Sequence, residues 1–222
     1  MLRIQTDRIF GRDRIIANIL NLFAYNEMKT RAGVVGVGLA EHVLNPLVAD
    51  KKRVHLVGHS FGGRLMTAAT AAVDGKISNL TVLEGAFSHN ALSSDGSIDG
   101  AYRSVIDNAK VAGRIVTAHS DNDVAVWIFY PLASWHFHDS YSAQLAGPLG
   151  QVFGGPTDRY GAIGANGPQN LINVNRLGFT GTSLPELRPG VNVPDCTSFV
   201  APHSDVWKQG SAYIVAAGLL SD

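Results

Sequence analysis

A serine stands between two glycines at the point where an apolar segment gives way to a helical pattern. The segment reads Gly58-His59-Ser60-Phe61-Gly62. A strand that turns sharply into a helix can hold one side chain in a strained backbone conformation when glycines two residues away on either side avoid a collision. Ser60 is therefore the candidate nucleophile of an acyl-transfer enzyme. The backbone N–H of Phe61, at the start of the helix, would donate to the oxyanion of the transition state.

The surrounding pattern supplies the elements that such a turn needs. Val54, Leu56 and Val57 predict a buried strand, and the small residues of 64–73 predict a helix. Further on, 80–83 and 114–118 predict buried strands with a short helix at 102–109 between them. We expect a last strand at 197–200 and a closing helix at 213–220. Strands that alternate with helices predict the α/β class, with a mostly parallel sheet and flanking helices, in a single domain over 1–222.

Two carboxylates follow the strand predicted at 114–118. In this architecture the acid and then the histidine come after the nucleophile, each beyond the carboxyl end of a strand. The strand runs into His119-Ser120-Asp121-Asn122-Asp123. We favour Asp123 as the acid, because such a loop closes on an aspartate shortly before an apolar residue, here Val126. Asp121 is the alternative, and its simpler role is to cap a turn.

The base is expected near the C-terminus, in Ala201-Pro202-His203-Ser204-Asp205. His203 lies between the last predicted strand and the closing helix. Its neutral imidazole would take the proton of Ser60, and Asp123 would fix the tautomer and stabilise the imidazolium. The predicted catalytic triad is Ser60, Asp123 and His203.

The segment 127–189 is long, irregular and rich in glycine, proline and aromatic residues, as is typical of a lid or binding loop. Its aromatic residues lie just after the acid and favour a hydrophobic acyl or aryl group as cargo. The same residues would equally well form a small core of the lid itself. The side chains expected to contact substrate are His59, His89, Trp127, Phe129 and Tyr130.

Composition excludes several classes of protein. The 222 residues carry 18 basic and 18 acidic side chains, so nothing favours binding to nucleic acid or to an anionic membrane, and a small molecule is the expected partner. Cys196 is the one cysteine, which excludes an internal disulfide, and the pair His136 and His138 lacks a third ligand at a recognisable spacing. We expect no metal and no other cofactor. Neither a signal core nor a run of membrane-spanning length is evident, which predicts a cytoplasmic protein.

These motifs carry a family resemblance. The segment from Gly58 to Gly62, the aspartate after the next-but-one strand and the late histidine together resemble the α/β-hydrolase superfamily over about 53–205. Met28-Lys29-Thr30-Arg31-Ala32-Gly33-Val34-Val35-Gly36, Gly85-Ala86-Phe87-Ser88-His89 and Tyr130-Pro131-Leu132-Ala133-Ser134 are similar to a group of bacterial α/β-hydrolases known mostly from sequence. The resemblance implies the fold, the triad and serine esterase activity on small to medium carboxylic esters. An amidase, thioesterase or acyltransferase would use the same triad, and a non-catalytic binding protein could keep the fold.

One departure from the superfamily has structural consequences. About fifty mostly helical residues precede Arg53, where the superfamily has three or four strands and a loop that provides the second oxyanion N–H. The second oxyanion donor is therefore unassigned, and the strand before Ser60 is expected at an edge of the sheet. Since an apolar edge invites pairing, we expect a homo-oligomer in which a partner or the N-terminal helices cover it.

Overall fold

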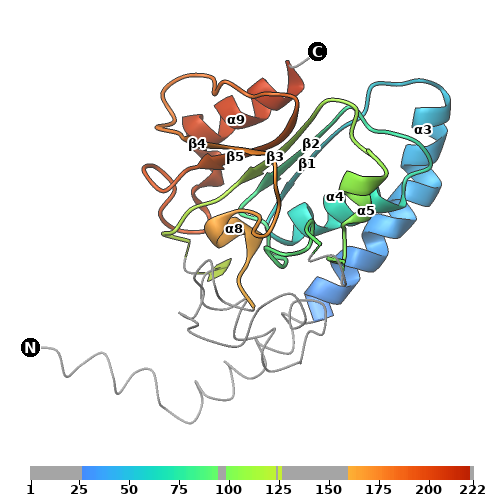
Figure 1. The fold of residues 1–222 in the computed structure, drawn as a ribbon, viewed down its shortest axis with the longest axis horizontal. Helices are drawn as coiled ribbons and strands as arrows, with labels where there is room; N and C mark the ends of the chain where they lie inside the picture. The colour runs from blue at the N-terminus through green and yellow to red at the C-terminus, as the bar shows by residue number, and fades with distance from the viewer. Residues whose placement is uncertain (1–26, 95–98, 124, 127–159, 221–222) are drawn as a thin grey trace, which may run out of the picture.

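A computed structural model of the protein describes residues 27–94, 99–123, 125–126 and 160–220. Within these ranges five strands form one sheet, and every neighbouring pair is parallel. The order across the sheet is β1-β2-β3-β5-β4, with bounds His55–His59 (β1), Asn79–Leu83 (β2), Arg114–Ala118 (β3), Val174–Gly178 (β4) and Gly190–Asp195 (β5). The sheet twists between helical layers (Figure 1). The predicted α/β class, with a parallel sheet and flanking helices, is confirmed.

Helices cover both faces of the sheet. Adjacent residues of a strand point to opposite faces, and β2 contacts a different helix through each of two neighbours. A Cβ placed on Gly63 of α4 (Phe61–Ala72) would lie 2.8 Å from Val82 Cγ1, whereas one placed on Gly218 of α9 (Gln209–Leu219) would lie 2.8 Å from Thr81 Oγ1. α4 and α9 therefore lie on opposite faces. β2 is buried along its whole length, as its continuous apolar pattern predicts.

A long helix, Glu27–Ala49, packs against α4 at the end of the molecule beyond β1 (Figure 1). A Cβ on Gly36 would lie 2.4 Å from the Leu65 carbonyl oxygen, so only glycine permits this approach. Asn45-Pro46 lies inside this helix and does not end it. The chain widens into a π-helical stretch, Ala40–Leu44, and continues as α3 (Asn45–Ala49), where Pro46 occupies the first turn. A proline inside a helix removes one backbone hydrogen bond, and the chain is widened directly before it.

Four expectations about elements need correction. The segment 197–200 is not a strand but a pair of turns on the Cys196 carbonyl, and the last strand is β5. β4 lies inside the region predicted to be irregular, as does the short buried helix α8 (Ile163–Asn166). β4 has the mixed sequence Val-Asn-Arg-Leu-Gly, which gives a weak strand signal because it sits at an edge. The helix α5 covers only Ser104–Asp107, and the rest of the predicted lid, 127–159, lies outside the described residues.

The main core lies between the sheet and the helices on the α4 face. Leu80, Val82 and Ile115 from the strands meet Ala68 and Ala69 of α4, all at most 5 % exposed. A second cluster under α9 joins Val116, Val200 and Ile214. Since apolar burial is the main favourable contribution to folding, these two layers hold the sheet rigid beneath the loops at its carboxyl edge.

Candidate active site

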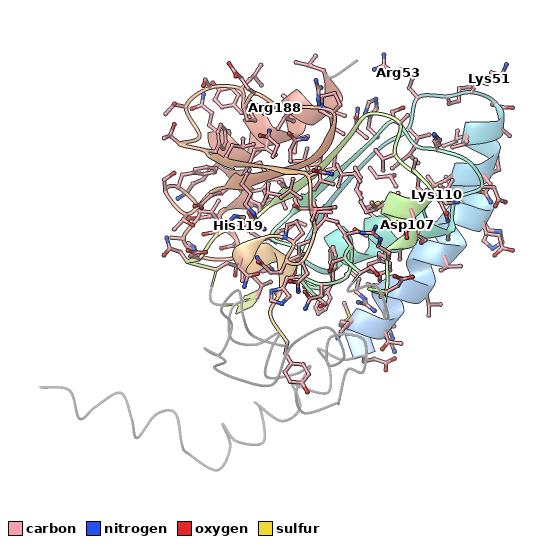
Figure 2. The ribbon with its side chains drawn as sticks, in the orientation of Figure 1. Lys51, Arg53, Asp107, Lys110, His119 and Arg188 are labelled. Carbon is pink, nitrogen blue, oxygen red and sulfur yellow. The ribbon has the colours of Figure 1, made fainter. Side chains whose placement is uncertain are left out.

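The carboxyl ends of the parallel strands meet at one edge of the sheet, and chemically active side chains follow four of them. Ser60 comes directly after β1, Glu84 after β2, the 119–123 loop after β3 and the loop with His203 after β5. His119, the first residue of the loop after β3, is labelled in Figure 2. In open α/β sheets ligands bind outside this edge. The candidate site lies here.

Ser60 forms the turn from β1 into α4 with φ 57° and ψ −123°. A non-glycine residue at such positive φ costs on the order of 1–3 kcal/mol and needs surrounding structure to hold it. Two backbone hydrogen bonds do so here: Ser60 N–H donates to the Leu83 carbonyl at 3.0 Å, and Ala86 N–H donates to the Ser60 carbonyl at 3.1 Å. The strained turn is therefore fastened to the end of β2.

The glycines around Ser60 differ in whether a side chain would fit at their position. A Cβ on Gly58 would lie 2.3 Å from the Gly62 carbonyl oxygen, so the strand and the helix touch through backbone. A Cβ on Gly62 would meet no atom of the described chain within 4 Å outside its own helix backbone, so the expected steric need for glycine at this position is wrong. Gly63, one residue later, has that need, because Val82 Cγ1 and the Gly58 carbonyl crowd it.

Asp123 and His203 are brought together from positions 80 residues apart. Asp123 Oδ2 lies 2.6 Å from His203 Nδ1, and the Asp123 side chain is fully buried. Asp123 Oδ1 accepts from the backbone N–H of Ala125 at 3.1 Å and of Val126 at 3.4 Å. The carboxylate is thus held in one orientation. With Nδ1–H donated to Asp123, the Nε2 atom of His203 is left as the basic nitrogen.

The loops that carry these two residues are tied to each other. Ser120 Oγ donates to the Val200 carbonyl at 2.6 Å, and Asn122 Nδ2 donates to the Thr197 carbonyl at 2.9 Å. Asp121, the alternative acid, has a side chain that is 66 % exposed and lies 3.9 Å from His119 rather than against His203. Its backbone N–H donates to Thr197 Oγ1.

His59, expected to contact substrate, lies against the histidine of this pair. The His59 and His203 rings are 4.4 Å apart between centroids and tilted by 39°. Burial and the nearby His203 lower the pKa of His59 from 6.5 to about 4, against opposing effects of Asp123 and of the His203 backbone. At neutral pH His59 is therefore uncharged, so that no fixed cation faces His203.

Glu84 is the residue that the sequence reasoning missed. It follows β2 at φ 42°, its side chain is 1 % exposed, and its Oε2 lies 3.8 Å from His59 Nε2. Neither carboxyl oxygen has a hydrogen-bond partner among the described residues. Burial, and then the charges of Asp123 and Asp205, raise the pKa of Glu84 from 4.5 to about 8. Its signal was present in the sequence, as a single acid directly after the apolar run 80–83 on the strand next to Ser60.

The remaining predicted residues have mixed outcomes. Phe61 is the first residue of α4, and its side chain packs against a small buried cluster of Ala86, Val126, Ala162 and Ala165.

His89 is 1 % exposed and its Nδ1 lies 2.9 Å from Asn166 Oδ1, a placement that supports a role in holding α8. Trp127, Phe129 and Tyr130 lie outside the described residues.

The described residues include no group of three or more His, Cys, Asp or Glu side chains arranged to hold a metal ion. Cys196 is buried, and burial together with the charges of Glu84 and Asp195 raises the pKa of its thiol well above the usual range. A thiol in that setting is inert, because the thiolate is the reactive form. Of the two residues, Ser60 remains the candidate nucleophile at this edge.

Comparison with known proteins adds no relative. No protein-family model, no curated protein and no solved structure matches the chain. The expectation that no run has membrane-spanning length is wrong for one segment. By length and composition alone, the Glu27–Ala49 helix could cross a membrane, although a core helix of a soluble protein can have the same length and composition.

Proposed function

We propose that the protein is a serine hydrolase that cleaves small to medium carboxylic esters through an acyl-enzyme on Ser60. One observation carries the proposal. Ser60, at φ 57° between a parallel strand and a helix, directly follows His59 in the chain. The His59 ring contacts the ring of His203, which is paired with the buried Asp123. A strained serine and an acid-oriented histidine at one sheet edge are the parts that acyl transfer requires.

In the first half of the reaction, Ser60 Oγ attacks the ester carbonyl carbon while His203 Nε2 accepts the hydroxyl proton. The imidazolium that forms is stabilised by Asp123 through the 2.6 Å contact at Nδ1. The tetrahedral intermediate then breaks its bond to the alkoxide oxygen, which takes the proton from Nε2 and leaves as the alcohol. Water repeats these steps on the acyl-enzyme and releases the carboxylic acid.

The negative oxygen of the intermediate would lie at the N-terminus of α4. The Phe61 backbone N–H is our assigned donor, and the aligned peptide dipoles of this 12-residue helix favour negative charge at the same end. His59, uncharged at neutral pH, lets the new positive charge reside on the His203–Asp123 pair.

The experiment is covalent labelling with a fluorophosphonate, read by intact mass, together with turnover of short-chain p-nitrophenyl esters. Wild-type protein is expected to gain one adduct and to turn over ester, and Ser60→Ala is expected to do neither. Ser104→Ala is the matched control on a helix away from the site, and it should behave as wild type. A folded wild-type protein that gains no adduct would refute the proposal and leave a non-catalytic binding protein as the better interpretation.

A further inference from the structure

The strand that leads to Ser60 has one neighbour in the part of the chain that the structure describes. β1 pairs with β2 through His55–His59 and is the first strand in the sheet order. Among the described residues β1 is therefore an edge strand, as predicted. An edge strand presents backbone N–H and C=O groups that another strand can pair with.

The two edges of the sheet differ in their chemistry. β4, at the far edge, carries Arg176 and Asn175, residues of the kind that discourage edge-to-edge pairing. β1 reads His-Leu-Val-Gly-His and has no Asp, Glu, Lys or Arg. Val57 at its centre is 36 % exposed, although it is a β-branched residue suited to a sheet interior. The β1 edge has the composition of a paired strand.

In the part of the chain that the structure describes, the helix beside this edge also exposes apolar side chains. The Glu27–Ala49 helix packs on α4 through a buried stripe that includes Ala32, Gly36, Ala40 and Leu44. Its other faces expose large apolar side chains, namely Met28, Val34, Val35, Val37, Val43 and Leu47, each 38–68 % exposed. An apolar surface of this kind, beside a strand that has one free side within the described part of the chain, is typical of an interaction site.

We propose that a second copy of this chain covers this surface, with the two β1 strands paired antiparallel about a two-fold axis through Val57. The axis places Val57 opposite its own copy, Leu56 opposite Gly58, and His55 opposite His59. No like charges face each other across the axis, because β1 has no acidic or strongly basic residue and burial keeps His59 neutral. Such an isologous contact closes on itself and yields a dimer rather than a fibre.

The same two-fold axis also determines where the Glu27–Ala49 helices of the two copies lie. A two-fold axis perpendicular to the sheet keeps the two Glu27–Ala49 helices on the same face of the joined sheet and antiparallel to each other. Because each helix lies at the β1 end of its own copy (Figure 1), the two helices become neighbours in one layer. Their exposed valines then gain an apolar partner. The two candidate sites lie at opposite ends of the strands of the joined sheet, because β1 runs in opposite directions in the two copies.

The decisive experiment is disulfide cross-linking, which is simple to interpret because the one native cysteine is buried. Cys196 is 1 % exposed, so a cysteine placed at an exposed position is the reactive one. Directly opposed residues of antiparallel strands have Cβ atoms about 4.5–5.5 Å apart, close enough for a disulfide after small adjustments. Val57→Cys is expected to form a disulfide-linked dimer under mild oxidation. Ile172→Cys, which is 83 % exposed beside the opposite edge, is the control and should remain largely unlinked.

Sedimentation measures the same contact without a cross-link. The wild-type protein is expected to sediment at twice its 23.6 kDa chain mass, and Val57→Lys at 23.6 kDa with an unchanged circular dichroism spectrum. A wild-type monomer would overturn the proposal, as would equal cross-linking at the two cysteine positions. A monomer that instead binds phosphatidylcholine–phosphatidylglycerol vesicles would assign the apolar helix to a membrane surface.

Discussion

Replacing Glu84 by glutamine should stabilise the protein in a way that grows with pH. Glu84 is buried beside His59 with both carboxyl oxygens unpaired among the described residues. Its pKa is raised from 4.5 to about 8 in the folded protein, so the folded state keeps a proton that the unfolded state releases above pH 4.5. Stability contributed by this group is fully present below pH 4.5 and is lost as pH rises towards 8. Glutamine has nearly the same shape and does not titrate.

The magnitude follows from the two pKa values. The gap between 4.5 and about 8, at 1.36 kcal/mol for each pKa unit, corresponds to about 5 kcal/mol of unfolding free energy. Most of this develops before neutrality, so that the variant should exceed wild type by about 3 kcal/mol at pH 7. A domain is stable by only about 5–15 kcal/mol, which makes this difference easy to measure.

Urea denaturation of both proteins between pH 4.5 and 9 is the assay. Glu41→Gln is the matched control, because the Glu41 side chain is 70 % exposed and should leave the pH dependence unchanged. The difference between Glu84→Gln and wild type should be near zero at pH 4.5 and level off above about pH 8. Parallel stability curves for the two proteins would refute the assignment of a protonated, buried Glu84.

Three further comparisons test individual features of the site. Asp123→Asn should slow fluorophosphonate labelling by about 10³–10⁴-fold, because the wrong imidazole tautomer is favoured, while Asp121→Asn should label at nearly the wild-type rate. Gly63→Ala should lose about 1–3 kcal/mol in urea unfolding because its Cβ meets crowded atoms, and Gly62→Ala should lose much less. Ser60→Gly should abolish labelling yet gain up to about 1 kcal/mol of stability, since glycine tolerates φ 57°; a loss of stability would argue against strain at this turn.

Local patterns predicted the buried half of the fold well. The strand at 114–118 has its predicted bounds, and the helix after Ser60 lies within one to three residues of its predicted bounds. Both segments lie in the core, where apolar periodicity is imposed by burial. The edge strand β4 was missed for the complementary reason, since its half-exposed residues obey no burial pattern. Hydrogen bonding to β5, rather than local preference, makes 174–178 a strand.

The candidate site likewise contains one residue that the sequence identifies and others that only tertiary contacts identify. Ser60 could be found from sequence because a strained turn between strand and helix needs particular small neighbours within a few residues. The choice between Asp121 and Asp123 depended on which carboxylate turns towards a loop 80 residues away, and contacts between the 119–123 and 197–203 loops decide that. The position of Glu84 directly after the strand at 80–83 was visible in the sequence, but its burial without a hydrogen-bond partner among the described residues depends on how the strand ends pack.

The sequence by itself therefore determined the alternation of strands and helices and the turn that holds Ser60, because each follows from steric needs and apolar periodicity along the chain. The edge position of β1 was expected only from the departure from the superfamily pattern. The tertiary structure alone decided which acid meets His203, that His59 stands between Glu84 and His203, and which surface of β1 is open. These are outcomes of packing, since distances between segments far apart in the chain are fixed only when the whole sheet and both helical layers have assembled.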